Sequence, residues 1–114
     1  MRKYLMLLIV AAGFASCTTT GSLYNWNDYV DASYKYYKKQ TPEATEHLMK
    51  TYEAMINKPN GSRRVIAPGI CGEYGYFLLQ NGKKEQGIAM LQKEKELYPE
   101  SAVFMDRLIN QFSK

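Results

Sequence analysis

The stretch "PGICGEYGYFLLQNGKKEQGIAMLQKEKELYPES", residues 68–101, decides the fold. Apolar residues recur at three- and four-residue spacing on both sides of Asn81-Gly82, which is a strong turn signal. Glycine suits the left-handed conformation that often ends a helix, and Pro99 cannot continue the second segment. The spacing therefore predicts two helices, over about 69–80 and 84–98, packed as an antiparallel hairpin. Residues expected to face inward on the second are Ile88, Leu91 and Leu97.

Small, bulky and proline residues occur at fixed distances within this hairpin. Counted from Pro68, small residues stand at positions 8 and 20, bulky residues at 11 and 24, and proline at 32. These residues are Gly75, Gly87, Leu78, Leu91 and Pro99. The pattern resembles a tetratricopeptide unit, with departures at Cys71 (position 4) and Glu94 (position 27). A helical glycine costs about 1 kcal/mol relative to alanine. We therefore expect the two backbones to cross closely at the glycines, with Leu78 and Leu91 filling the seam.

The rest of the chain after residue 25 shows the same helical pattern. A looser copy of the hairpin spans residues 26–58, with Thr41 expected as N-cap and Pro42 as the first helical residue. Its two expected stripes are Trp26, Tyr29, Val30, Ser33, Tyr36 and Tyr37, and Leu48, Tyr52, Met55 and Ile56. A last helix, N-capped by Ser101, would present Met105, Leu108, Ile109 and Phe112 on one side. The predicted fold class is all-α: about five helices in antiparallel hairpins, a short tetratricopeptide-like solenoid with a C-terminal capping helix.

The N-terminal segment reads as a secretory signal that ends at a cysteine. Two basic residues precede a twelve-residue apolar run, residues 4–15, which is shorter than the roughly 20 residues of a spanning helix. Residues 14–17, "FASC", resemble the bacterial lipobox. The resemblance implies cleavage before Cys17, a diacylglycerol thioether on its sulfur and an acyl chain on the new amine. A disulfide to Cys71 would be a poor strut at a processed terminus, and a metal site lacks ligands because His47 is the single histidine.

The expected organisation is therefore a signal peptide (1–16), a lipidated N-terminus with a flexible tether (17–24) and one helical domain (25–114). Removal of residues 1–16 lowers the formal net charge from +4 to +2, because the signal contains Arg2 and Lys3. This charge is too low for a nucleic-acid surface, so no nucleic-acid partner is expected. Thr18 stands where Asp would signal inner-membrane retention, which favours the outer membrane.

The sequence nominates no catalytic machinery, so we do not expect an enzyme. His47 stands alone and is expected at the surface or in a helix seam. Cys71 occupies a packing position, where a small buried residue is the ordinary interpretation. The run 93–96, "KEKE", alternates in sign and is expected to be a solvated helix surface. No cofactor other than the acyl chains on Cys17, and no metal, is predicted.

Tyrosine is abundant, with ten residues in the chain. At helical spacing most of these rings are expected in the core, because each buries about 150 to 250 Å². In tetratricopeptide repeats the first helix of each pair lines a ligand groove. The resemblance therefore makes Tyr36, Lys39, Tyr76 and Gln80 candidate partner-binding residues, with packing as the alternative for the two tyrosines.

The lipobox, "YNW" (24–26), "PGICGEYGYFLLQNGK" (68–83) and "KEKELYPES" (93–101) together resemble a family of small bacterial lipoproteins known only as a domain of unknown function. Such proteins are typically encoded beside a lipoprotein similar to the curli secretion channel subunit. The resemblance implies a membrane-anchored envelope adaptor that binds another envelope protein, with a second lipoprotein as the candidate partner. The alternatives are a self-assembling structural lipoprotein and a small-molecule or peptidoglycan-binding module. The sequence does not indicate the oligomeric state.

Overall fold

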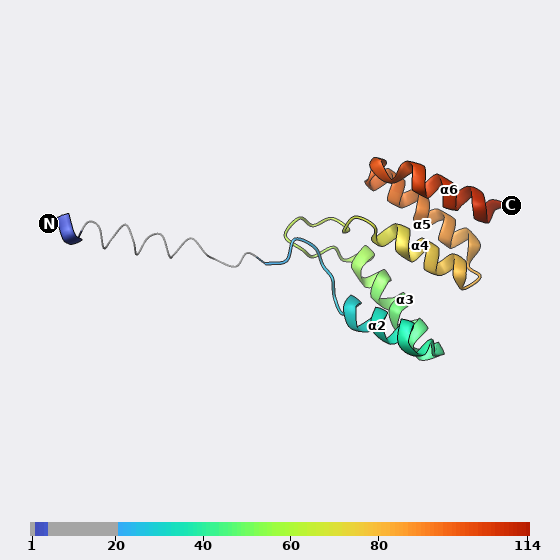
Figure 1. The fold of residues 1–114 in the computed structure, drawn as a ribbon, viewed down its shortest axis with the longest axis horizontal. Coiled ribbons are helices and arrows are strands. Elements are labelled where there is room, and N and C mark those ends of the chain that lie inside the picture. Colours follow the sequence, from blue (N-terminus) through green and yellow to red (C-terminus); the bar gives the residue numbers. More distant parts are fainter. Residues whose placement is uncertain (1, 5–20) are drawn as a thin grey trace.

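The computed structural model describes residues 2–4 and 21–114, and within them residues 21–114 form an all-helical domain (Figure 1). The elements are α2 (Tyr29–Lys39), α3 (Pro42–Asn57), α4 (Ile70–Gln80), α5 (Lys84–Leu97), the 3₁₀ helix η1 (Pro99–Ser101) and α6 (Ala102–Ser113). No strand occurs in the described part of the chain. The predicted all-α class, with about five helices, is confirmed. Cys17 lies outside the described residues.

The α4–α5 hairpin has the close crossing predicted from its glycines. Gly82 adopts a φ of +77° in the turn between the helices. A Cβ added to Gly75 would lie 2.8 Å from the carbonyl oxygen of Gly87, and one added to Gly87 would lie 2.8 Å from that of Gly75. Leu91 packs against Gly75 as expected, but the residue against Gly87 is Leu79 rather than Leu78. The two backbones therefore meet at the predicted positions with one changed seam residue.

The α2–α3 hairpin begins its second helix as predicted. The Thr41 hydroxyl accepts a hydrogen bond from the Ala44 N–H at 3.1 Å, and Pro42 is the first helical residue. The expected α3 stripe is entirely buried. The α2 stripe was predicted in part wrongly: Ala32 is fully buried, whereas Val30 and Tyr37 face outward. Tyrosine hydroxyls reach solvent at little cost, so the aromatic pattern did not distinguish the inner from the outer face.

The junction between α5 and α6 differs from prediction in two details. Leu97, the last residue of α5, is 43% exposed rather than buried. The Ser101 hydroxyl does not cap α6; it donates to the Tyr98 carbonyl at 2.7 Å, since η1 leads directly into the helix. The apolar side of α6 is as expected, with Met105 buried and Leu108, Ile109 and Phe112 packed beside it.

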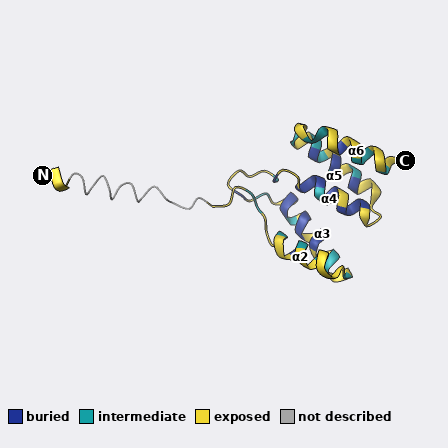
Figure 2. Ribbon diagram, viewed as in Figure 1, coloured by how far each residue is buried: buried dark blue, intermediate teal, exposed yellow. Residues whose placement is uncertain are grey.

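The core consists of two clusters that meet at α4. The larger cluster joins α2, α3 and α4, and it includes Leu48, Tyr52 and Leu78. The smaller one joins α4, α5 and α6 around Leu79 and Leu91. Figure 2 shows the resulting pattern, with α4 largely buried and the outer sides of α2 and α6 exposed. The central position of α4 explains its near-continuous apolar sequence.

The last residues of the expected tether contact the domain. The Ser62 N–H donates to the Ser22 carbonyl at 3.0 Å, and the Arg63 N–H donates to the Leu23 carbonyl at 3.1 Å. Gly61 permits this pairing, because a Cβ there would clash with the Leu23 carbonyl. Ser22 and Leu23 are therefore held against the α3–α4 loop.

Candidate functional site

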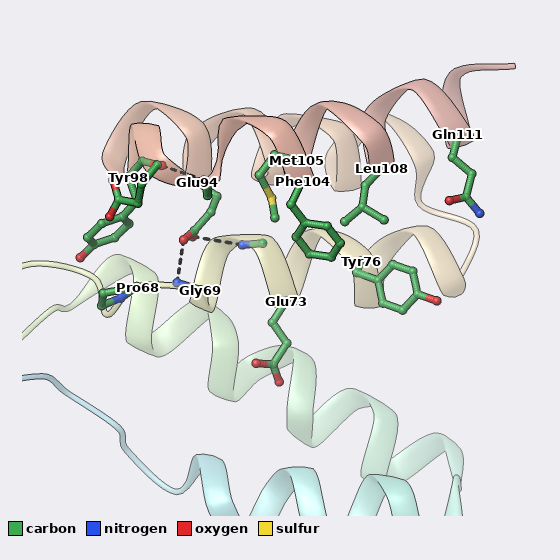
Figure 3. Close-up of a pocket in the computed structure, with 13 residues that line it drawn as sticks. Pro68, Gly69, Glu73, Tyr76, Glu94, Tyr98, Phe104, Met105, Leu108 and Gln111 are labelled. Atoms are coloured by element: carbon green, nitrogen blue, oxygen red, sulfur yellow. Dashed lines mark hydrogen bonds between the residues drawn. The ribbon is translucent and has the colours of Figure 1, made fainter.

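A groove of about 730 Å³ lies between α4 and α6, with the C-terminal end of α5 and η1 at one side (Figure 3). This volume is within the range of about 300 to 1,000 Å³ usual for ligand sites. Its wall is largely apolar. The residues that decide its character are Tyr76, Glu94, Phe104, Met105 and Leu108. It is the candidate functional site of the domain.

Glu94 forms the floor of the groove and is only 2% exposed. Its carboxylate accepts hydrogen bonds from the Gly69 N–H at 2.6 Å and the Gly72 N–H at 3.2 Å, which are drawn as dashed lines in Figure 3. These N–H groups belong to Gly69, the N-cap residue of α4, and to Gly72 in its first turn, and Gly69 has no side chain that could cap the helix. A carboxylate at a helix N-terminus also interacts favourably with the helix dipole. Glu94 is therefore a long-range cap that ties α5 to α4.

The prediction of a solvated surface for Glu94 is thus wrong. Alternating charge along α5 identifies an exposed face only when no neighbouring helix offers hydrogen-bond donors to it. Two sequence signals pointed to Glu94: it occupies a position where the repeat pattern asks for alanine, and a glycine, Gly69, stands at the N-cap position of α4. The absence of a side chain at Gly72 leaves room for Glu94 and Met105, since a Cβ there would lie 3.2 Å from Met105 and 3.4 Å from Glu94.

Exposed aromatic rings form the mouth of the groove. Phe104 is 61% exposed and Tyr76 is 41% exposed, although both are large rings. The Tyr76 ring meets the Phe112 ring edge-on, with centroids 6.1 Å apart. Figure 3 shows Phe104 and Leu108 projecting from α6 toward α4. Large exposed rings beside a concave apolar surface are typical of binding sites.

The charged side chains that line the groove are all acidic: Glu73, Glu94 and Glu100. Glu73 also links the two hairpins, because one of its carboxylate oxygens accepts the hydroxyl protons of Tyr29 and Tyr52, the latter at 2.6 Å. Burial, followed by the bond to Glu73, raises the pKa of both tyrosines. Their hydroxyls therefore stay protonated and donate to Glu73. The carboxylates of Glu73, Glu94 and Glu100 give the groove a negative charge, which favours a ligand with a cationic group.

The structure places one of the four sequence-predicted partner-binding residues in the groove. Tyr76 lines it, while Gln80 is exposed at the end of α4 and is not part of its lining. Tyr36 is half-buried against Phe77, with ring centroids 5.3 Å apart, so the packing interpretation holds for that ring. Lys39 is exposed at the end of α2 and also lies outside the lining. Glu73, Phe104, Leu108 and Gln111 also line the groove, and none of them was predicted as a partner-binding residue; Leu108 was expected only as part of the apolar side of the last helix.

His47 and Cys71, the other residues considered for catalysis or metal binding, lie where the sequence predicted them. His47 is at the surface as predicted, with its Nε2 2.6 Å from the Asp28 carboxylate. Cys71 is fully buried as predicted, and burial raises the pKa of its thiol to about 11. Within residues 2–4 and 21–114, no three His, Cys, Asp or Glu side chains gather as a metal site. No helix over the same residues is long and apolar enough to cross a membrane.

Comparison with known protein families identifies the family to which the chain belongs. A family model described as "Domain of unknown function (DUF4810)" matches residues 23–108. The chain belongs to this family. The DUF4810 match begins in the segment paired with the α3–α4 loop and ends in α6, so it includes most of the groove. No curated protein and no solved structure matches the chain.

Proposed function

We propose that this protein is a lipid-anchored adaptor of the bacterial envelope, which binds another envelope protein through the α4–α6 groove. The lipobox-like "FASC" supports an anchor at Cys17, carrying a diacylglycerol thioether and an N-acyl chain. Multiple acyl chains are what stable membrane attachment requires. Thr18 after the cysteine favours the outer membrane, and confinement there raises the effective concentration of partners on the same surface. Catalysis is not part of this proposal.

The arrangement of helices supports a tetratricopeptide-like interpretation. In it, α2–α3 and α4–α5 are two units, and α6 is the first helix of a third unit that caps the array. The groove then lies between the first helices of two successive units, on the face that such repeats use for ligands. The close backbone contact of Gly75 with Gly87 is the feature of the hairpin that fits this pattern best.

One observation supports a binding function: the groove is apolar and aromatic, and the charged residues that line it are all acidic. A partner that fits it presents apolar side chains to Phe104 and Leu108. It also presents a lysine or arginine toward Glu73 or Glu100. We propose an amphipathic segment of another envelope protein, with a lipoprotein related to the curli secretion channel as the first candidate.

Site-specific crosslinking in native membranes tests this adaptor. A photoreactive phenylalanine analogue at Phe104 should capture one envelope protein, identified by mass spectrometry. The matched control is the same analogue at Tyr34, which is also 61% exposed but lies on α2. Capture at position 104 and not at 34 supports the groove. Self-capture at 104 would favour the self-assembling alternative, and capture of lipid alone would contradict the adaptor.

A further inference from the structure

Two loops form one end of the domain, the end at which the described domain begins (Figure 1). They are residues 21–28, before α2, and residues 58–69, between α3 and α4. We call the surface that they form the entry-end surface. It is separate from the α4–α6 groove over most of its extent, since Pro68 and Gly69 are the residues they share.

Hydrogen bonds hold the two loops in one arrangement. Besides the backbone pairing of Ser22 and Leu23 with residues 62–63, the Asn25 side chain donates to the Lys58 carbonyl at 2.7 Å. The Arg63 guanidinium donates to the Tyr24 hydroxyl at 2.9 Å. The side chains of the entry-end surface are therefore presented by fixed backbone.

This surface combines exposed apolar side chains with basic ones. Leu23 is 55% exposed, Trp26 42% and Val65 44%. Its basic residues are Lys58, Arg63 and Arg64, all of which are exposed; the single acidic residue of the two loops is Asp28, whose carboxylate contacts His47 of α3. Tryptophan with apolar neighbours and surrounding lysine or arginine is the composition typical of protein surfaces at a membrane interface. Long basic side chains can reach phosphate groups while their stems lie along apolar surface.

We propose that the entry-end surface lies on a bilayer surface that carries anionic headgroups, with Leu23, Trp26 and Val65 at the level of the headgroups. The proposal rests on the lipid anchor proposed above. Cys17 precedes Leu23 by six residues, a distance of chain that spans at most about 20 Å. An anchor at Cys17 would thus keep this surface within reach of the membrane. Anionic headgroups attract Lys58, Arg63 and Arg64 and repel the acidic groove, which leaves the groove available to a partner.

Trp26 is the single tryptophan of the chain and reports directly on this contact. The acylated protein is reconstituted with vesicles of phosphatidylcholine, with or without phosphatidylglycerol, whose acyl chains are brominated. Flotation of the vesicles measures attachment, and quenching of Trp26 fluorescence measures insertion. We expect attachment in both lipids, and at least twofold stronger quenching in the anionic vesicles. The double variant Arg63→Gln/Arg64→Gln should lower that quenching to the zwitterionic level while flotation is unchanged.

The control variant is Lys38→Gln/Lys39→Gln, which removes the same charge from the far end of α2, about 16 Å along an 11-residue helix. It should leave quenching unchanged. Attached protein with unquenched Trp26, or equal quenching in the Arg63→Gln/Arg64→Gln variant, would overturn the entry-end proposal and leave the anchor intact. Quenching at high lipid concentration without flotation would overturn the anchor and support this surface. Absence of both signals would overturn both.

Discussion

Glu94 and Glu96 lie two residues apart on α5 and have opposite environments. Glu94 is buried under the groove and accepts hydrogen bonds from the backbone N–H groups of Gly69 and Gly72 at the N-terminus of α4, whereas Glu96 is exposed. The charge of Glu94 is compensated by hydrogen bonds and by the helix dipole of α4, which is why a buried carboxylate is tolerated. The function of this glutamate is structural, and it positions one side of the candidate site.

Replacement of Glu94 by alanine should lower the free energy of unfolding by about 1 to 3 kcal/mol, because it leaves the N–H groups of Gly69 and Gly72 without their acceptor. Glu94→Gln should cost less, since the amide oxygen retains one acceptor. Glu96→Ala is the matched control and should change stability by no more than about 0.5 kcal/mol. Urea unfolding followed by circular dichroism measures all three. Equal stabilities of the Glu94→Ala and Glu96→Ala variants would exclude the capping role.

Gly87 should not accept a methyl group. In Gly87→Ala the new Cβ would lie 2.7 Å from Leu79 Cγ and 2.8 Å from the Gly75 carbonyl oxygen. Because one of these atoms belongs to the backbone and cannot move aside easily, overpacking should cost toward the upper end of about 1 to 3 kcal/mol, which outweighs the roughly 1 kcal/mol that alanine contributes to helix propensity. We expect net destabilisation, read as a lower melting temperature. Gly21→Ala is the control, because no atom lies within 4 Å of the added group. An unchanged melting temperature for Gly87→Ala would refute the close crossing.

At the scale of elements, α2 is joined to α3 by polar contacts as well as by its apolar face. The Asp28 carboxylate, just before α2, contacts His47 at 2.6 Å and accepts the Thr51 hydroxyl proton at 3.1 Å. The hydrogen bond with His47, and then that with Thr51, lowers the pKa of Asp28 below its ordinary value of 3.8, against the opposing effect of burial. Two residues of α3 thus hold the start of α2.

This contact predicts a pH-dependent stability. Because folding lowers the pKa of Asp28, its contribution is fully present above the unfolded pKa of 3.8 and is lost as the pH falls through the folded value. Both side chains of the Asp28–His47 pair are 46% exposed. Asp28→Asn should therefore lower the free energy of unfolding at neutral pH by at most about 1 kcal/mol. The difference from the wild type should shrink as the pH falls below about 3.8.

Urea unfolding at neutral and acidic pH measures the effect. The control is Asp31→Asn on the same helix, whose partner Lys35 is exposed, with an expected change of no more than about 0.5 kcal/mol. A difference between wild type and Asp28→Asn that stayed constant with pH would show that the carboxylate charge is not involved.

At the scale of the whole molecule, one acylated end and one binding groove would give the protein two separate attachments. The proposed contacts are also of opposite charge, since the entry-end surface is basic and the groove is acidic. An anionic membrane would therefore favour an orientation in which the loops approach the lipid and the groove remains open. Such a division suits an adaptor that holds a partner beside a membrane.

The proposed anchor is tested by replacement of Cys17, the residue expected to be acylated. Cys17→Ala removes the sulfur that would form the thioether, so we expect loss of lipid labelling and loss of membrane retention. Palmitate labelling followed by membrane fractionation measures both. Cys71→Ala is the control, because that thiol is fully buried in the folded domain. Normal acylation of the Cys17→Ala variant would contradict the proposed attachment.

Sequence periodicity predicted the positions of the helices, but it did not predict correctly which face of every helix is buried. The Thr41 cap, the Gly82 turn and the buried stripe of α3 are local features, and they were predicted because the residues concerned act on their own backbone. The faces of α2 were assigned partly wrongly, since tyrosine can pack with its ring and still expose its hydroxyl. Of the candidate site, Tyr76 was found from the repeat pattern, while Phe104 and Leu108 were not.

The sequence by itself determined the all-α class, the helix positions and the close crossing at Gly75 and Gly87. These follow from local propensity, turn chemistry and the absence of side chains at two positions. Only the tertiary structure decided that Glu94 is buried and that α4 and α6 enclose an acidic groove. The physical reason is that a carboxylate on one helix and free N–H groups on another stabilise each other only after the helices have packed, and periodicity along one helix contains no information about its neighbour.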